Sequence, residues 1–194
     1  MRKGGGKQKG SAFERVVCKA LSLWVSGGKL EDVFWRSAMS GGRATVARKK
    51  GRSAEAAAGD ISAVRPIGSA LLSLFLVECK SYKDLQLHGM FDADMAGGIC
   101  GMWKKLCIDS AALDKMPMMV AKQNGMKSFV LLNAAGVIAL DLDNPKLGKG
   151  IFQAAFPKAD AYMLSLTTMT ELGARLTYTE KPKLKLRFAS TDYN

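Results

Sequence analysis

The acidic pair Asp60 and Glu78, with Lys80 two residues after Glu78, constrains this 194-residue chain more than any other feature. Glu78 and Lys80 stand at the end of the apolar run Leu71 to Val77, which predicts a buried strand over residues 71–80. Side chains alternate between the two faces of a strand. Glu78 and Lys80 therefore share one face, about 6.6 Å apart along it, and Cys79 lies on the other.

Residues 60–64 predict a second strand, and the Pro and Gly of residues 65–69 predict a turn between the two strands. Such an antiparallel hairpin sets Asp60 opposite residue 77 or 78. Two carboxylates and one amine then converge at one end of a sheet. Metal-dependent phosphodiester hydrolysis uses this set, because carboxylates hold Mg²⁺ and an ammonium orients the attacking water. A solvated, salt-bridged sheet end is the alternative interpretation.

A helix is predicted near the N-terminus, with Glu14 close to its beginning. It opens within residues 9–15, and Gly27-Gly28 ends it. Ser11 and Glu14 have capping-box spacing, in which the glutamate bonds the N-cap amide, so a structural role is the alternative to a catalytic one. The apolar residues of this helix recur at helical spacing: Phe13, Val16, Val17, Ala20, Leu21 and Trp24.

Four sequence elements occur in an order that resembles a known family. The resemblance is to the PD-(D/E)xK nucleases, and most of all to archaeal-type Holliday junction resolvases and their phage-encoded relatives, with Gly59 where proline is usual. It covers roughly residues 9–132 and implies an α/β, restriction-endonuclease-like core. The four elements are Lys-Gly-x-x-Phe-Glu-Arg at residues 9–15, Ser40-Gly41-Gly42, Gly59-Asp60 and Glu78-Cys79-Lys80.

The resemblance also implies roles for individual residues around one scissile phosphate. Mg²⁺ is the expected cofactor, with Mn²⁺ able to substitute, and a homodimer is implied because resolvases cut paired strands symmetrically. The implied roles are metal ligation by Asp60, Glu78 and the Cys79 backbone carbonyl, positioning or activation of water by Lys80, metal support by Glu14, and phosphate contact by Ser40 and Arg43.

Positive charge is concentrated in the first 52 residues. The chain carries a formal charge of +12, and residues 1–52 hold thirteen Lys or Arg against three acids, a surplus of ten. Surfaces of this kind bind phosphates, so DNA is the expected partner. Residues 43–58 are longer than in the resolvases, and we expect a mobile loop that closes on DNA. Its basic residues are Arg43, Arg48, Lys49, Lys50 and Arg52.

Length and composition favour one domain with a single core. We expect a mobile basic tail at residues 1–9, a nuclease core at 10–132 and an extension of the same domain at 133–194. The sequence has no secretory h-region and no apolar run of eighteen residues, which favours a cytoplasmic protein, in the host cell if phage-encoded.

Cysteine and histidine usage excludes several other kinds of site. The single histidine, His88, rules out a centre built on several imidazoles, and we expect it in a loop. The sequence contains no Walker-type loop, so we expect no nucleotide cofactor. The four cysteines lack metal-ligand spacing and are expected to be reduced core thiols: Cys18, Cys79, Cys100 and Cys107.

The remaining pattern predicts the order α-β-β-β-α-β-β, a central mixed sheet flanked by helices. The first short strand is Val33 to Arg36, and Asn124-Gly125 predicts a hairpin turn. Lys122 either faces phosphate or is solvated. The other expected elements are a helix at residues 91–113, strands at 117–122, 126–132, 137–140 and 183–188, and a turn at 141–145.

Three hypotheses of function remain open from sequence. The first is a structure-selective endonuclease that resolves four-way junctions. The second is a nuclease of the same fold that cuts linear or single-stranded DNA. The third is a non-catalytic DNA-binding protein.

Overall fold

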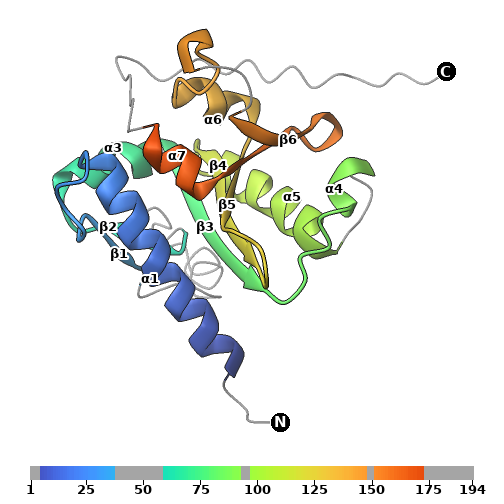
Figure 1. Ribbon diagram of the computed structural model, residues 1–194, viewed down its shortest axis with the longest axis horizontal. Coiled ribbons are helices and arrows are strands. Elements are labelled where there is room, and N and C mark those ends of the chain that lie inside the picture. The colour runs from blue at the N-terminus through green and yellow to red at the C-terminus, as the bar shows by residue number, and fades with distance from the viewer. Residues whose placement is uncertain (1–4, 38–58, 93–96, 148–150, 173–194) are drawn as a thin grey trace.

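The computed structural model describes residues 5–37, 59–92, 97–147 and 151–172. They form a five-stranded mixed sheet with helices on both faces, and a two-stranded antiparallel unit lies beside it (Figure 1). The expected α/β, restriction-endonuclease-like architecture is confirmed.

The five strands are arranged in the order β3-β4-β5-β7-β6, which places β3 at an edge. β3 pairs in parallel with β4, and the other neighbours are antiparallel. The predicted Asn124-Gly125 turn joins β4 to β5, and Gly125 has a φ of +77°. Two strands come from beyond residue 132, so the C-terminal segment builds part of the central sheet. The strands are β3 (Phe75–Tyr82), β4 (Met116–Gln123), β5 (Phe129–Leu132), β6 (Phe152–Phe156) and β7 (Ala161–Ser165).

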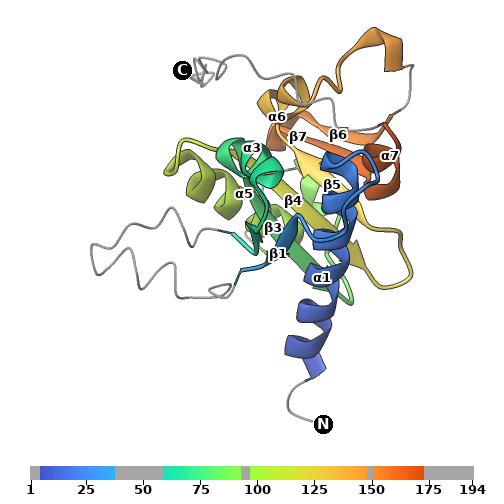
Figure 2. The same ribbon diagram turned by 90° about the vertical axis from the view of Figure 1, so that its left-hand side faces the viewer.

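One face of the sheet shares a core with four helices, and this layer faces the viewer in Figure 2. The N-terminal helix begins at Gly5, earlier than predicted, so part of the expected tail at residues 1–9 is helical. Val16, expected in the core, is 57% exposed. The predicted end is confirmed, because the Gly28 N–H donates to the Leu23 carbonyl at 2.7 Å. The helices are α1 (Gly5–Val25), α3 (Pro66–Leu74), α6 (Ala134–Ala139) and α7 (Leu166–Glu171).

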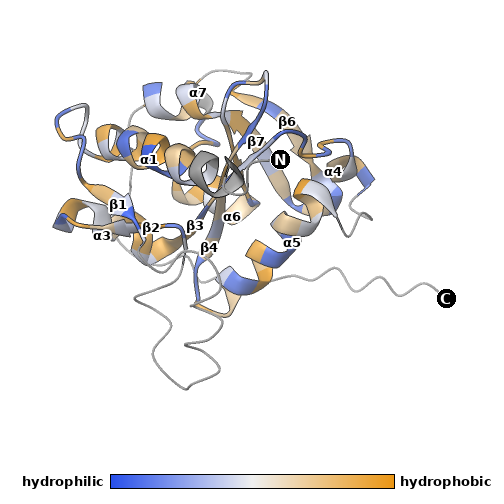
Figure 3. Ribbon diagram, turned by 90° about the horizontal axis from the view of Figure 1, so that it is seen from below, coloured by the Kyte–Doolittle hydropathy of each residue, from blue (hydrophilic) through white to orange (hydrophobic). Residues whose placement is uncertain are grey.

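The opposite face is covered by α4 (Gly89–Asp92) and α5 (Gly98–Ala111), which lie across the sheet from α1 and α3 in Figure 3. The predicted helix at residues 91–113 is confirmed over Gly98–Ala111, but its predicted start is wrong, because α4 ends at Asp92 and α5 begins at Gly98. Gly98 has a φ of +60°, which lies outside the right-handed helical region, so a continuous helix cannot pass through it. Two 3-10 turns complete the described part, η2 (Pro145–Leu147) and η3 (Pro157–Ala159).

The predicted hairpin between residues 60 and 80 is wrong. Residues 66–74 form α3, which begins with Pro66 in its first turn, where the missing N–H costs no hydrogen bond. Gly68 is buried in this helix rather than in a turn. A Cβ there would lie 2.8 Å from both Phe34 and Val33, so glycine allows α3 to pack against the neighbouring strand.

That neighbouring strand is β1 (Phe34–Arg36), which pairs antiparallel with β2 (Ile61–Ala63). Both strands were predicted. One further bond extends the pairing, because the Ser37 N–H donates to the Asp60 carbonyl at 2.9 Å. The two-stranded unit thus holds the chain at Asp60.

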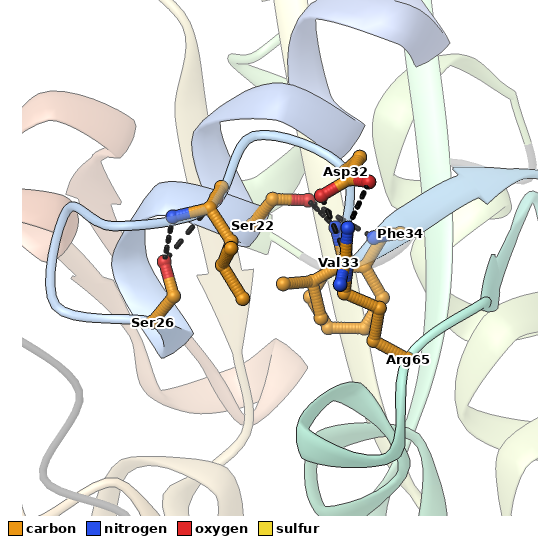
Figure 4. A network of polar contacts seen from close by, with 7 residues as sticks. Ser22, Ser26, Asp32, Val33, Phe34 and Arg65 are labelled. Carbon is orange, nitrogen blue, oxygen red and sulfur yellow. Dashed lines mark hydrogen bonds and ion pairs between the residues drawn. The ribbon is translucent and has the colours of Figure 1, made fainter.

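A buried serine fixes β1 against α1 (Figure 4). Ser22 Oγ, on a fully buried side chain, accepts from the N–H groups of Val33 at 3.0 Å and Phe34 at 2.9 Å. At the surface, Arg65 binds Asp32 through two N–H groups, at 2.9 and 2.5 Å. These contacts set the position of β1 relative to α1 and α3.

The predicted strand at residues 137–140 is also wrong, because residues 134–139 form α6. Asn133 caps this helix: its Oδ1 accepts from the Gly136 N–H at 2.9 Å. The turn expected after it, at Asp141, is present. The predicted strand at 183–188 lies outside the described residues. Among the helices of the described part, none has the length and apolarity to cross a bilayer.

Candidate functional site

The outer edge of β3 carries the two acids that the sequence singles out. The Asp60 N–H donates to the Val77 carbonyl at 3.0 Å, and Asp60 Oδ2 accepts from the Cys79 N–H at 2.8 Å. Glu78 lies between those two partners. The predicted neighbourhood of Asp60 and residues 77–78 is therefore confirmed, although the chain reaches it through β2 and α3 and not through a hairpin.

Gly59 explains how Asp60 comes so close to β3. Its φ is +89°, and a Cβ built there would lie 2.8 Å from the Val77 carbonyl oxygen. Proline fixes φ near −65°, so the proline that is usual at this position in the nucleases the sequence resembles does not fit this backbone. Glycine alone avoids both the strain and the collision.

Glu78 and Lys80 form an ion pair on the face of β3 that is turned toward α5. Lys80 Nζ lies 2.5 Å from Glu78 Oε2, and about a quarter of each side chain is exposed, 26% and 27%. Tyr82 follows on the same face, as the period of two predicts. All three side chains line a half-open cleft of about 220 Å³, which is completed by Met119 of β4 and by Met102, Lys105, Leu106 and Asp109 of α5.

The surroundings of Asp60 favour the protonated form of its carboxyl group. Burial raises the pKa of Asp60 to about 6, and repulsion from Glu78 adds to the increase; the Cys79 N–H and the Lys80 charge oppose it only in part. A carboxyl of this kind gains from a bound cation, because the positive charge offsets the cost of ionising a buried carboxyl beside a second acid.

Lys80 stays charged in this environment. Burial lowers the pKa of Lys80, but the charge of Glu78 and its hydrogen bond outweigh burial, so that the pKa is raised above its usual value. An ammonium at neutral pH donates hydrogen bonds and has no lone pair with which to take a proton. A charged Lys80 can therefore position a water molecule but cannot take a proton from it.

Cys79 contributes backbone and not thiol chemistry. Its side chain belongs to the core shared with α1, and burial raises the pKa of the thiol well above the usual value. In an extended strand the N–H and the carbonyl of one residue point to the same edge. Since the Cys79 N–H donates to Asp60, its carbonyl also faces the Asp60 side of β3.

Glu14 reaches the same region from the middle of α1. Ser11 and Glu14 lie well inside this helix, so the capping-box interpretation is wrong. Glu14 Oε2 lies 2.5 Å from Arg36 Nε, and only 14% of the Glu14 side chain and 29% of Arg36 are exposed. Negative charge at Glu14 also raises the pKa of Asp60 slightly, which places the two carboxyl groups within electrostatic range.

Two side chains of this region escaped the sequence analysis. Arg36 lies at the end of a predicted strand, and nothing in the sequence pairs it with a residue on α1. Tyr82 follows Glu78 and Lys80 at period two, which was a usable signal, but the predicted strand ended at residue 80. The structure extends β3 to Tyr82 and brings it to the cleft.

Other predicted residues lie away from the site or outside the described residues. His88 is exposed in the turn before α4, as expected for a loop histidine, and Lys122 is an exposed residue of β4. The four cysteines are free, and three of them are buried. The predicted DNA contacts lie outside the described residues: Ser40, Arg43, Arg48, Lys49, Lys50 and Arg52.

The donor atoms at this edge fit a hard divalent cation. Asp60, Glu78 and the Cys79 carbonyl offer oxygen atoms, and Mg²⁺ is commonly held by one or two carboxylates with waters completing the shell. Within the ranges that the structure describes, no three His, Cys, Asp or Glu side chains gather as a metal cluster. A closed zinc site made of imidazoles and thiolates therefore does not fit the described residues.

Comparison with known protein families gives a match over most of the chain. The model of a family described as "Phage putative PDDEXK endonuclease" matches residues 5–177. The match includes Glu14, Asp60, Glu78 and Lys80, and it extends well beyond residue 132, where the sequence resemblance ended. Searches of curated proteins and of solved structures gave no match.

Proposed function

Because the chain belongs to this family of phage PD-(D/E)xK endonucleases, we propose that it is a Mg²⁺-dependent, structure-selective DNA endonuclease that resolves four-way junctions. The observation that carries the proposal is the convergence at the β3 edge: Asp60 bonds the Cys79 N–H, and Lys80 pairs with Glu78. Four-way junctions are the substrate of the resolvases that the four sequence elements resemble.

The residues divide the work of hydrolysis among them. Asp60, Glu78 and the Cys79 carbonyl would hold Mg²⁺, or Mn²⁺ in its place, and the ion would polarise the scissile phosphate and acidify bound water. Lys80 donates hydrogen bonds to the attacking water and holds it in line. Glu14 would hold a second ion or an ion-bound water in place of its partner Arg36, and Arg36 would then be free to contact the phosphate.

Affinity for DNA would come from a different set of residues. The N-terminal 52 residues carry the surplus of positive charge, and Ser40 and Arg43 would contact the scissile strand. Arg48, Lys49, Lys50 and Arg52 would neutralise phosphates of the junction arms. A homodimer would place two such sites on one junction.

A cleavage assay with three substrates tests the proposal. A labelled four-way junction, a duplex and a single strand of matched sequence are incubated with Mg²⁺, with Mn²⁺ or with EDTA. We expect metal-dependent cuts of the junction at symmetric positions. Preferred cutting of the duplex or the single strand would show that the protein is a nuclease for linear DNA and not a resolvase. Binding without any cleavage in either metal would show that the protein binds DNA without cutting it.

Sedimentation of the protein with and without the junction tests the dimer. A monomer bound singly to the junction would contradict it.

A further inference from the structure

The cleft beside Glu78 and Lys80 has a second half that metal chemistry does not use. That half is formed by Tyr82, Met102, Lys105, Leu106, Asp109 and Met119, here called the Tyr82 cleft. Its floor is apolar and closely packed, since Met119 is fully buried and Leu106 is 2% exposed. Tyr82, in contrast, is 47% exposed at the end of β3. A large aromatic side chain with half its surface free, above an apolar floor, has room for a flat ligand.

The rim of the Tyr82 cleft is polar. Lys105 and Asp109 form an i,i+4 ion pair on α5, and both line the opening. Together they present donors and an acceptor at the edge of a site whose interior is apolar. A heteroaromatic ring with polar edges matches this division, whereas an alkyl chain leaves the ion pair unused and a phosphate leaves the floor unused.

Size and distance fit one nucleobase. A cavity of roughly 150 Å³ lined by apolar side chains holds benzene, so the whole cleft of about 220 Å³, which includes the Glu78 and Lys80 half, has room for a single base beside the ion pair. Tyr82 lies two residues beyond Lys80 on the same face, about 6.6 Å along the strand. A nucleotide next to the phosphate held at Lys80 is therefore within reach, provided that its base has left the helical stack.

On the basis of the proposed nuclease function, we infer that the Tyr82 cleft binds one unstacked nucleobase adjacent to the scissile phosphate. Tyr82 stacks on the base, and Lys105 and Asp109 contact its edge. The cleft thus selects DNA in which a nucleotide beside the cut is unpaired or easily unpaired, as at a branch point. A base within an intact duplex cannot enter it without the cost of flipping.

Equilibrium binding in EDTA tests this without any cleavage. The probes are a fluorescein-labelled duplex with one unpaired nucleotide and the same duplex with an abasic spacer at that position. For the wild-type protein we expect roughly tenfold weaker binding of the abasic probe, as for loss of one stacked base. Tyr82→Ala should bind both probes equally. Met102→Phe, which fills the cleft from α5, should do the same. Tyr82→Phe should keep the preference.

Ile108→Ala is the matched control, because Ile108 is 70% exposed on the same helix and does not line the cleft. It should behave as wild type. Equal wild-type affinity for the two probes, or an unchanged preference in both Tyr82→Ala and Met102→Phe, would overturn the inference. A cleaving enzyme with no base preference loses only this inference. A protein that shows the preference but never cleaves loses only the proposed function.

Discussion

At the residue scale, the charge and hydrogen-bonding capacity of three side chains should decide the rate. We expect Asp60→Asn, Glu78→Gln and Lys80→Ala each to lower the cleavage rate by roughly a hundredfold to a thousandfold, the usual effect of losing one oriented charge in a transition state. Junction affinity should stay nearly unchanged, because basic residues elsewhere supply it. Single-turnover cleavage and fluorescence anisotropy measure the two quantities. Wild-type rates in all three variants would show that the catalytic site does not lie at this edge of β3.

The buried carboxyl of Asp60 should also make stability depend on pH. Its pKa is about 6 in the folded protein and ~3.9 in an unfolded chain. Between these values the folded state binds more protons, so the wild type loses stability as pH rises from about 4 to 6, by about 2 to 3 kcal/mol in total. Asn cannot ionise. In EDTA, the stability of Asp60→Asn relative to wild type should therefore increase over this range and level off above it.

Urea unfolding at several pH values measures this difference. Asp143→Asn is the control, since Asp143 is exposed, and it should show no such rise. A difference between Asp60→Asn and wild type that is independent of pH would mean that the carboxyl titrates normally.

Gly59 should be irreplaceable for a backbone reason. Alanine at φ +89°, with its Cβ 2.8 Å from the Val77 oxygen, should destabilise the fold by about 1 to 3 kcal/mol and shift Asp60 away from β3, so cleavage falls as well. Gly125 offers a matched control, because its φ is +77° but its Cβ would meet no atom within 4 Å. Thermal unfolding and cleavage of both variants are compared. Normal cleavage by Gly59→Ala would show that this approach is not required.

At the element scale, α1 matters because it carries Glu14 to a site built mainly on β3. Glutamine retains the size of Glu14 and its helix propensity, and its amide oxygen can still accept from Arg36 Nε, so Glu14→Gln should lower stability by only about 1 to 3 kcal/mol but lower the cleavage rate at least tenfold. Glu31→Gln is the control, since Glu31 pairs with Lys19 of α1 at 2.9 Å, mostly exposed. Calorimetry and single-turnover rates separate the two effects. Full activity of a folded Glu14→Gln protein would show that the only role of Glu14 is its ion pair with Arg36.

The helices and strands also show which parts of the fold could be predicted from the sequence. Strands β1, β2, β4 and β5 and the Asn124-Gly125 turn were predictable, because each has a local signal. The segment at residues 66–74 was not, since a short apolar run has no period that distinguishes strand from helix. Gly68 looked like a turn residue but serves close packing against β1. Asn133 was a usable cap signal for α6 that the interpretation as a strand overlooked.

The candidate site was predictable for a different reason. Asp60 and the Glu-x-Lys triplet were recognisable as a pattern, whereas Arg36 and Tyr82 depend on which helix lies over which strand. Contacts between distant elements are set by packing of the whole fold, and packing leaves no regular mark in one sequence.

At the scale of the whole molecule, we expect catalysis and DNA affinity to depend on different segments of the chain. We expect three or four of the side chains Arg43, Arg48, Lys49, Lys50 and Arg52 to contact phosphates. Replacing all five by Ser should then reduce the slope of log affinity against log salt by roughly 3 to 4, at about 0.9 per phosphate contact. Cleavage at saturating DNA should change far less. A salt titration of junction binding measures the slope. A variant with Ser at the exposed positions Lys127, Lys146 and Lys158 is the control and should keep it. An unchanged slope in the first variant would show that this segment does not contact the backbone.

The bond between the Ser37 N–H and the Asp60 carbonyl has a consequence for how the fold tolerates changes in chain length. The chain leaves β1 and returns to β2 at one clamped point, so the intervening residues begin and end at nearly the same place. Lengthening a closed loop costs little, since each doubling adds only about 0.6 kcal/mol. The length of the chain between Ser37 and Asp60 can therefore change at little cost in folding free energy, while this bond keeps Asp60 in register with β3.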